Sequence, residues 1–127
     1  MHPKAKLFYD KRNLVFQELN MEYYRLLLKG SSEKVMADYA AVKEKLPSID
    51  SYKNPQNLSA EDYLKYLLEN KEYLQNMSAF LRIAKDSFND CTPLIEKLNK
   101  EDLSSEDKFE LCNRLASAKS CIDVLIN

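Results

Sequence analysis

The stretch from Ala60 to Asp90 constrains the fold most, because its apolar residues recur at spacings of seven. Residues three, four and seven apart share one side of an α-helix, so these positions merge into a broad face. No Gly or Pro interrupts the stretch, and such a wide face needs more than one other helix to cover it. We therefore expect a central helix at about 60–90, with these rows facing inward: Tyr63, Asn70, Met77, Ala84 and Cys91; Tyr66, Tyr73, Phe80 and Ser87; Leu67, Leu74, Leu81 and Phe88.

One position in this face is polar in a way that needs an explanation. Asn70 carries an amide where the neighbouring rows carry large apolar groups. A buried Asn can fix the register of packed helices. An Asn at the end of a bundle can also lie at the surface, and the sequence leaves both interpretations open.

Helix start and stop signals divide the rest of the chain. Pro3 and Gly30 bracket a long helix at about 4–29, and Pro47 ends a shorter one at about 33–46. Pro93 predicts a break after the central helix, followed by a short helix at about 93–99. Leu111, Leu115, Ala118, Ile122 and Leu125 alternate in steps of four and three, which predicts a last helix at about 105–126.

These elements predict an all-α fold in a single domain over residues 1–127. Three long helices (about 4–29, 60–90 and 105–126) and two short ones (about 33–46 and 93–99) should pack as an antiparallel up-down bundle. A single Gly in the chain argues against strands and turns. Residues 47–57 read as a loop, either a crossover between helix ends or a flexible binding loop.

The first helix has two apolar faces. Its main stripe comprises Phe8, Val15, Phe16, Leu19, Tyr23, Leu26 and Leu27. A second row, separated from the first by polar residues, repeats every seven residues and comprises Leu7, Leu14, Met21 and Leu28. Either the helix at 33–46 folds over this second row, or another protein chain does.

Known catalytic and metal-binding patterns are missing from the sequence. The only histidine, His2, lies next to the chain start, and the single glycine excludes a glycine-rich phosphate loop. The three cysteines (Cys91, Cys112 and Cys121) lack the spacing of a zinc site, so we expect them to be small, buried and reduced. Paired carboxylates occur at helix starts, where they favour the positive end of the helix dipole. We expect no enzyme activity, no metal and no cofactor.

The charge and the cysteines of the sequence limit the expected kinds of partner and the expected cellular location. The formal charge is −1, with about +3 over residues 1–30 and about −4 over residues 59–127. No apolar run is long enough to span a membrane, no signal peptide is recognisable, and the odd cysteine count argues against a disulfide framework. An intracellular location, in the cytoplasm or nucleus, is therefore expected.

The function that the residues favour is a noncatalytic protein-interaction module or a subunit of a protein complex. Its partner would be another protein or a second copy of the chain, bound through an amphipathic helix seam. The candidate partner-binding residues are Leu7, Leu14, Met21, Tyr24, Leu28, Leu64 and Leu68.

Two other classes stay open as alternatives. A small nucleic-acid-associated protein would use the basic residues of the first helix, although they are spread around its circumference: Lys4, Lys6, Lys11, Arg12, Arg25 and Lys29. An enzyme or ligand carrier would use a tyrosine-lined core as a pocket. We expect that neither of these alternatives holds, so that the protein binds neither nucleic acid nor a small molecule.

Overall fold

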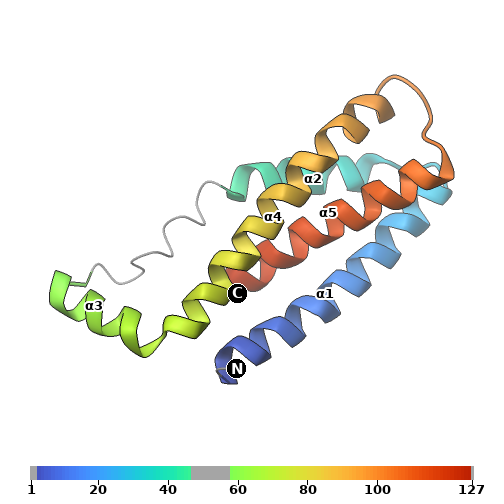
Figure 1. Ribbon diagram of the computed structural model, residues 1–127. Coiled ribbons are helices and arrows are strands. Elements are labelled where there is room, and N and C mark those ends of the chain that lie inside the picture. Colours follow the sequence, from blue (N-terminus) through green and yellow to red (C-terminus); the bar gives the residue numbers. More distant parts are fainter. Residues whose placement is uncertain (1–2, 47–57, 127) are drawn as a thin grey trace.

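The computed structural model describes residues 3–46 and 58–126, and within these residues the chain is helical with no strand. The helices are α1 (Pro3–Leu28), α2 (Glu33–Lys45), α3 (Ala60–Glu69), α4 (Lys71–Leu98) and α5 (Ser105–Ile126). Figure 1 shows α1, α4 and α5 side by side, with α2 packed on them. The all-α bundle is confirmed. The expected loop at 47–57 and His2 lie outside the described residues.

Helix α1 ends as its sequence predicts. Gly30 adopts φ +79°, a left-handed conformation that glycine reaches without steric cost. The Gly30 amide donates to the Leu27 carbonyl oxygen at 3.1 Å, and the Ser31 amide donates to that of Leu26 at 2.9 Å. These two bonds form a Schellman motif, which satisfies the last carbonyls of the helix.

The expected uninterrupted helix at 60–90 is wrong, because the chain breaks at Asn70. The Asn70 backbone has φ −117° and ψ 21°, outside the helical region. Its side-chain amide donates to the Tyr66 carbonyl oxygen at 3.0 Å, as does its own backbone amide. Asn side chains compete in this way with the regular helical hydrogen bonds. Asn70 is half-buried and separates α3 from α4, so the role of a buried Asn that fixes register does not apply. The alternative of a position at the bundle end is closer, because α3 leaves the bundle at this junction.

The break expected at Pro93 is also wrong, and the short helix expected at 93–99 is the last part of α4. A proline removes the helical hydrogen bond to the carbonyl four residues earlier, here that of Asn89. Both residues are exposed, so water can satisfy that carbonyl. Cys91 and Ile95 lie on the opposite, buried side of the helix. Their burial favours a continuous helix through the proline.

Helix α5, and not the stretch at 60–90, is the centre of the bundle. Ten residues of α5 are buried, whereas five are buried in α4 and none in α3. The extensive contacts of α5 are with α1 on one side and α4 on the other. The inward-facing rows are therefore buried only in their second half, at Phe80, Ala84, Ser87 and Cys91. Leu74, expected in the middle of the core, is only half-buried.

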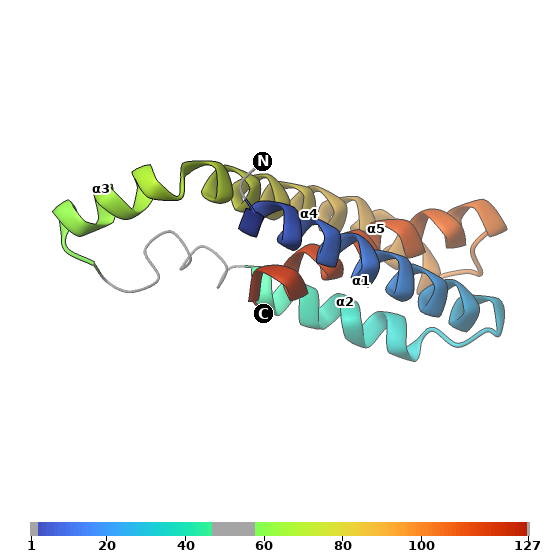
Figure 2. The same ribbon diagram turned by 90° about the horizontal axis from the view of Figure 1, so that it is seen from below.

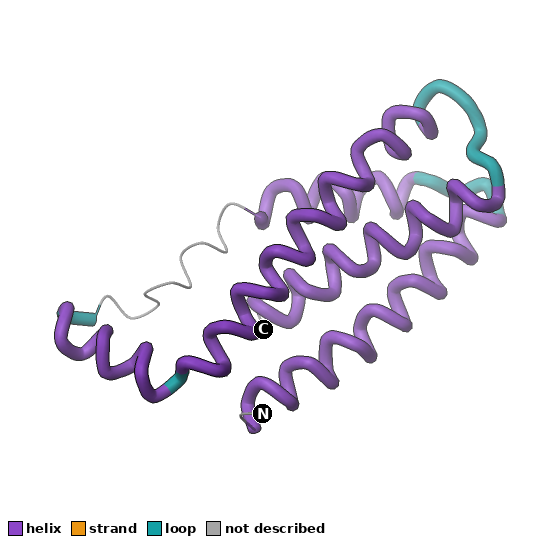
Figure 3. Tube along the Cα trace, in the orientation of Figure 1, coloured by secondary structure: helices purple, strands orange, loops and turns teal. Residues whose placement is uncertain are grey.

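Helix α3 continues beyond the end of the bundle. Figure 2 shows it extending away from α1, α2 and α5, joined to the rest of the described fold through α4. Figure 3 shows the links 29–32 and 99–104 together at the other end. Helix α2 is held by its side chains: Tyr39 stacks on Phe88 of α4, with ring centroids 5.0 Å apart, and shares a 3.0 Å hydrogen bond with Thr92.

Candidate functional site

The second apolar row of α1 lies open at the surface. Its four side chains are exposed by 70% at Leu7, 63% at Leu14, 74% at Met21 and 58% at Leu28. We call these four residues the outer stripe. The alternative in which the second helix covers them is wrong, because α2 packs elsewhere and all four are more than half exposed.

The outer stripe and the core occupy opposite sides of α1. The buried residues of the helix are Ala5, Tyr23 and Leu27, and their positions on the helical wheel lie across the axis from the stripe. The helix is therefore fixed in the bundle by one side while the other side presents its apolar row to solvent. A rigid element that carries exposed side chains in line is suited to binding another helix.

Two flanking rows border the outer stripe. Each lies about 50° from it on the helical wheel. One row consists of Asp10, Gln17 and Tyr24. The other row consists of three charged residues, Lys11, Glu18 and Arg25. All except Tyr24 are exposed. The apolar row thus has polar margins, as protein-binding surfaces do.

Tyr24, a predicted site residue, is half-buried and extends the apolar surface toward α5. Its ring meets the Phe109 ring edge to face, with centroids 5.8 Å apart. Phe109 is itself 50% exposed. Sequence reasoning missed this residue, although its place on the far side of α5 from Leu111 and Leu115 is a signal that it does not belong to the core.

The other two predicted site residues do not extend the outer stripe. Leu64 and Leu68 are 58% and 69% exposed, one turn apart on α3. Figures 1 and 2 place α3 apart from α1, beyond the end of the bundle. The two leucines form a separate small apolar surface.

Of the six basic residues of the first helix, Arg12 is half-buried and the other five are exposed. Arg12 turns inward, where its guanidinium donates to the Ser117 hydroxyl at 3.1 Å and lies 5.4 Å from the centre of the Phe16 ring. It also donates to the Cys121 sulfur at 3.5 Å. The guanidinium also donates to the Asn13 side-chain oxygen at 3.0 Å. A hydroxyl, a ring, a sulfur and an amide oxygen thus accommodate this charge within the apolar stripe, with no carboxylate among these contacts. Arg12 is therefore not presented to a nucleic-acid backbone.

The three cysteines are buried and unpaired. Burial raises the pKa of the Cys91 thiol to about 12 and that of Cys112 to about 12, since the charged thiolate is poorly solvated there. Such thiols are weak nucleophiles. Within residues 3–46 and 58–126, no group of three or more His, Cys, Asp or Glu side chains converges on a possible metal position.

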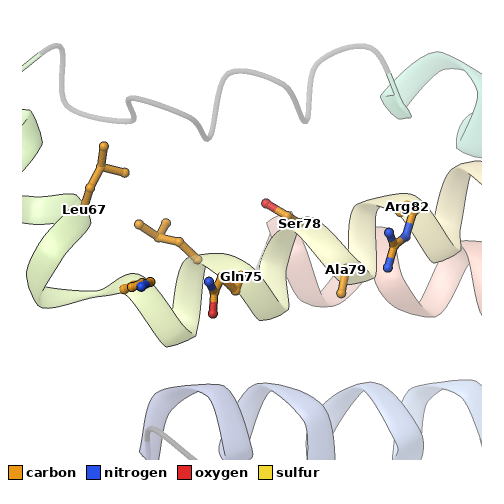
Figure 4. Close-up of a pocket in the computed structure, with 7 residues that line it drawn as sticks. Leu67, Gln75, Ser78, Ala79 and Arg82 are labelled. Carbon is orange, nitrogen blue, oxygen red and sulfur yellow. The ribbon is translucent and has the colours of Figure 1, made fainter.

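A surface groove of about 410 Å³ runs along α4 near its junction with α3. Figure 4 shows Leu67 from α3, with Gln75 and Ser78 pointing to different sides of α4. Small-molecule sites instead surround a ligand with convergent polar groups in a concave cavity. This groove is open, contains no tyrosine among its lining residues, and lies outside the core. It does not match the tyrosine-lined pocket that a ligand carrier would use.

Comparisons with protein-family models, curated proteins and solved structures find no match to this chain. Among the described helices, none is both long enough and apolar enough to cross a lipid bilayer.

Proposed function

We propose that this protein is a noncatalytic interaction module or complex subunit, and that the outer stripe of α1 binds an amphipathic helix of its partner. The observation that carries the proposal is the exposure of Leu7, Leu14, Met21 and Leu28, each more than half accessible to solvent. Four large apolar side chains in line are an unusual surface for a protein with no partner.

The energetics support association. Covering the four side chains would remove on the order of 400 Å² of apolar surface from water on this chain alone. At about 25 cal/mol per Å², this is a substantial favourable term before the entropy cost of association is subtracted. The stripe sits on a helix anchored by Tyr23 and Leu27, so little ordering of the backbone is needed on binding.

The rest of the chemistry is consistent with a binding role. The buried thiols are kept protonated, and Arg12, the most inward of the basic side chains of α1, is engaged with α5. Unpaired buried cysteines suit a reducing compartment, and this supports the proposal that the module acts in the cytoplasm or nucleus.

The experiment that tests the proposal compares two double variants of matched chemistry. Leu14→Lys with Met21→Lys puts two charges into the outer stripe, and Leu64→Lys with Leu68→Lys puts two into the exposed surface of α3. Each protein is immobilised and used to capture partners from its native source, with identification by mass spectrometry. We expect the α1 variant to lose the partner that the wild-type protein captures and the α3 variant to keep it.

Two results would contradict the proposal. One is an unchanged set of captured proteins with the α1 variant. The other is loss of the partner with the α3 variant only, which would move the binding surface to Leu64 and Leu68. A salt titration adds a check on the class of partner, because nucleic-acid binding through phosphate contacts weakens steeply with salt whereas an apolar seam does not.

A further inference from the structure

We propose that the occupant of the outer stripe is a second copy of the same chain, paired in parallel and in register along α1. This inference rests on the proposed function, because it names the partner of the same surface. The spacing of the stripe, the charges of its flanking rows and the area that would be covered support it.

The spacing of the stripe suits a two-fold pair. A two-fold axis parallel to α1 brings each residue opposite its own counterpart, so Leu7, Leu14, Met21 and Leu28 each meet the same residue of the second copy. On a straight helix a seven-residue row drifts by about 20° per repeat. Two such helices therefore stay in contact when they cross at about 20°.

The flanking rows complement one another in this arrangement. In a parallel pair, the row of Lys11, Glu18 and Arg25 faces the opposite flank of the second copy. Lys11 then lies opposite Asp10, a pair of opposite charges. Glu18 lies opposite Gln17, which can donate hydrogen bonds to a carboxylate. Arg25 lies opposite Tyr24, a pairing of cation and aromatic ring.

The antiparallel arrangement fits less well. It brings each flank against the same flank of the second copy, since the chain direction is reversed. With all four stripe residues paired, Lys11 would face Arg25 and Glu18 would face Glu18. Both contacts are between like charges, which is unfavourable. A shifted antiparallel register avoids this but leaves one stripe residue without a partner at the end of the seam.

The area sets the strength of the pair. Two copies together would cover on the order of 800 Å² of stripe surface, and the flanking residues add to it. Stable specific interfaces bury about 1,200–2,000 Å² in total. The stripe alone falls below that range and the flanking residues bring the seam closer to its lower limit, so we expect a dimer that dissociates on dilution.

The first measurement is the mass of the full chain in solution. Sedimentation equilibrium from about 1 to 200 μM should show a monomer converting to a dimer as the concentration rises. Leu14→Lys with Met21→Lys should stay monomeric over the whole range, and Leu64→Lys with Leu68→Lys should dimerise like the wild type. A wild-type monomer throughout would overturn the proposal, and so would a dimer that the α1 variant still forms.

The second measurement reads the direction and register of the pair. Leu7→Cys and Leu28→Cys each place one exposed thiol on the stripe, while the three native cysteines are buried and stay silent under mild oxidation. In the parallel register each variant alone forms a disulfide dimer. If disulfides form only when the two variants are mixed, the helices run antiparallel and the proposed arrangement is wrong.

The third measurement tests the charge pairing. Lys11→Glu places a carboxylate opposite Asp10 of the second copy and should raise the dissociation constant about tenfold, because two exposed pairs become repulsive. Exchanging the two residues, Asp10→Lys with Lys11→Asp, restores opposite charges and should restore wild-type affinity. No recovery on exchange would contradict the pairing.

Failure of this inference can be told from failure of the proposed function. If the chain is a monomer but captures a different protein that depends on Leu14 and Met21, the stripe binds a partner other than itself. If the chain is a monomer and nothing captured depends on the stripe, both proposals are wrong.

Discussion

The hydroxyl of Tyr23 on α1 donates a 2.7 Å hydrogen bond to the Oδ2 atom of Asp38 on α2. The same carboxylate oxygen accepts from the Lys34 ammonium group at 3.1 Å. Tyr23 is fully buried, so its ring belongs to the core while its hydroxyl reaches the edge of α2. This contact ties the short helix to the face of α1 that lies opposite the outer stripe.

Tyr23→Phe should lower the free energy of unfolding by about 1–3 kcal/mol, because a hydrogen bond to a charged acceptor is lost while the ring is kept. Urea denaturation followed by circular dichroism measures this. Tyr9→Phe is the matched control, since Tyr9 is an exposed tyrosine on the same helix, and it should change stability by less than about 0.5 kcal/mol. Equal effects of the two changes would contradict a special role for the Tyr23 hydroxyl.

Alkaline pH provides a second test of this contact. Burial and the nearby Asp38 raise the pKa of Tyr23 far above its ordinary value of 10.0. Above about pH 10 the unfolded chain releases this proton and the folded protein keeps it, so stability falls as the pH rises, by up to about 1.4 kcal/mol per pH unit for one group. Below the ordinary value the contribution is fully present. Unfolding free energies measured from neutral pH to above pH 10 should fall less steeply in Tyr23→Phe than in the wild type.

Leu115→Ala should cost about 2–5 kcal/mol, because it opens a cavity in the middle of the most buried helix. Leu74→Ala should cost clearly less, since Leu74 is half-buried at the edge of a surface groove. Thermal and urea denaturation of the two variants give the comparison. A larger loss for Leu74→Ala would restore the stretch at 60–90 as the centre of the fold.

Local signals in the sequence predicted the helix ends well. Gly30 caps α1 as expected, and Ser59 accepts a 3.3 Å hydrogen bond from the Asp62 amide at the start of α3. Helices α1, α2 and α5 end within one residue of their expected bounds. These features depend on a few neighbouring residues, so a single sequence carries them.

The errors arose where a local signal competes with packing. At Asn70 the side-chain hydrogen bond to Tyr66 breaks the helix because no buried neighbour holds α3 in line. At Pro93 the opposite occurs, and the burial of Cys91 and Ile95 carries α4 through a residue that usually ends helices. The spacing of hydrophobic residues alone does not show whether the local signal or the packing decides the structure at these two positions.

The choice of the central helix failed for a related reason. The stretch at 60–90 has the widest apolar face in the sequence. A wide apolar face shows how much surface a helix could bury, but not how much of it other helices cover. Small residues let two helices approach α5 from different sides, and Ala116, Ala118 and Cys121 are fully buried there. The sequence located the outer stripe of α1 but left open whether the helix at 33–46 covers it, because helical spacing does not show where that helix packs.

The buried thiols give a prediction for chemical reactivity. A thiol reagent such as Ellman's reagent should modify almost none of the three cysteines in the native protein and all three in the denatured chain, since burial keeps the thiols inaccessible and raises the pKa of Cys91 and Cys112. Reductant and chelator should leave the melting temperature unchanged. Fast modification of the native protein, or a large drop in melting temperature with chelator, would show that the cysteines have another role.

The proposed function requires that the outer stripe of α1 is a surface outside the core. It is tested most directly by the free energy of unfolding of Leu14→Lys with Met21→Lys, measured at a protein concentration where the wild type is monomeric. Leu115→Lys with Ile122→Lys, two buried positions with the same spacing of seven, is the matched control. We predict that the stripe variant stays within about 1 kcal/mol of the wild type, since exposed positions tolerate lysine, while the control fails to fold. A loss of several kcal/mol in the stripe variant would contradict the account.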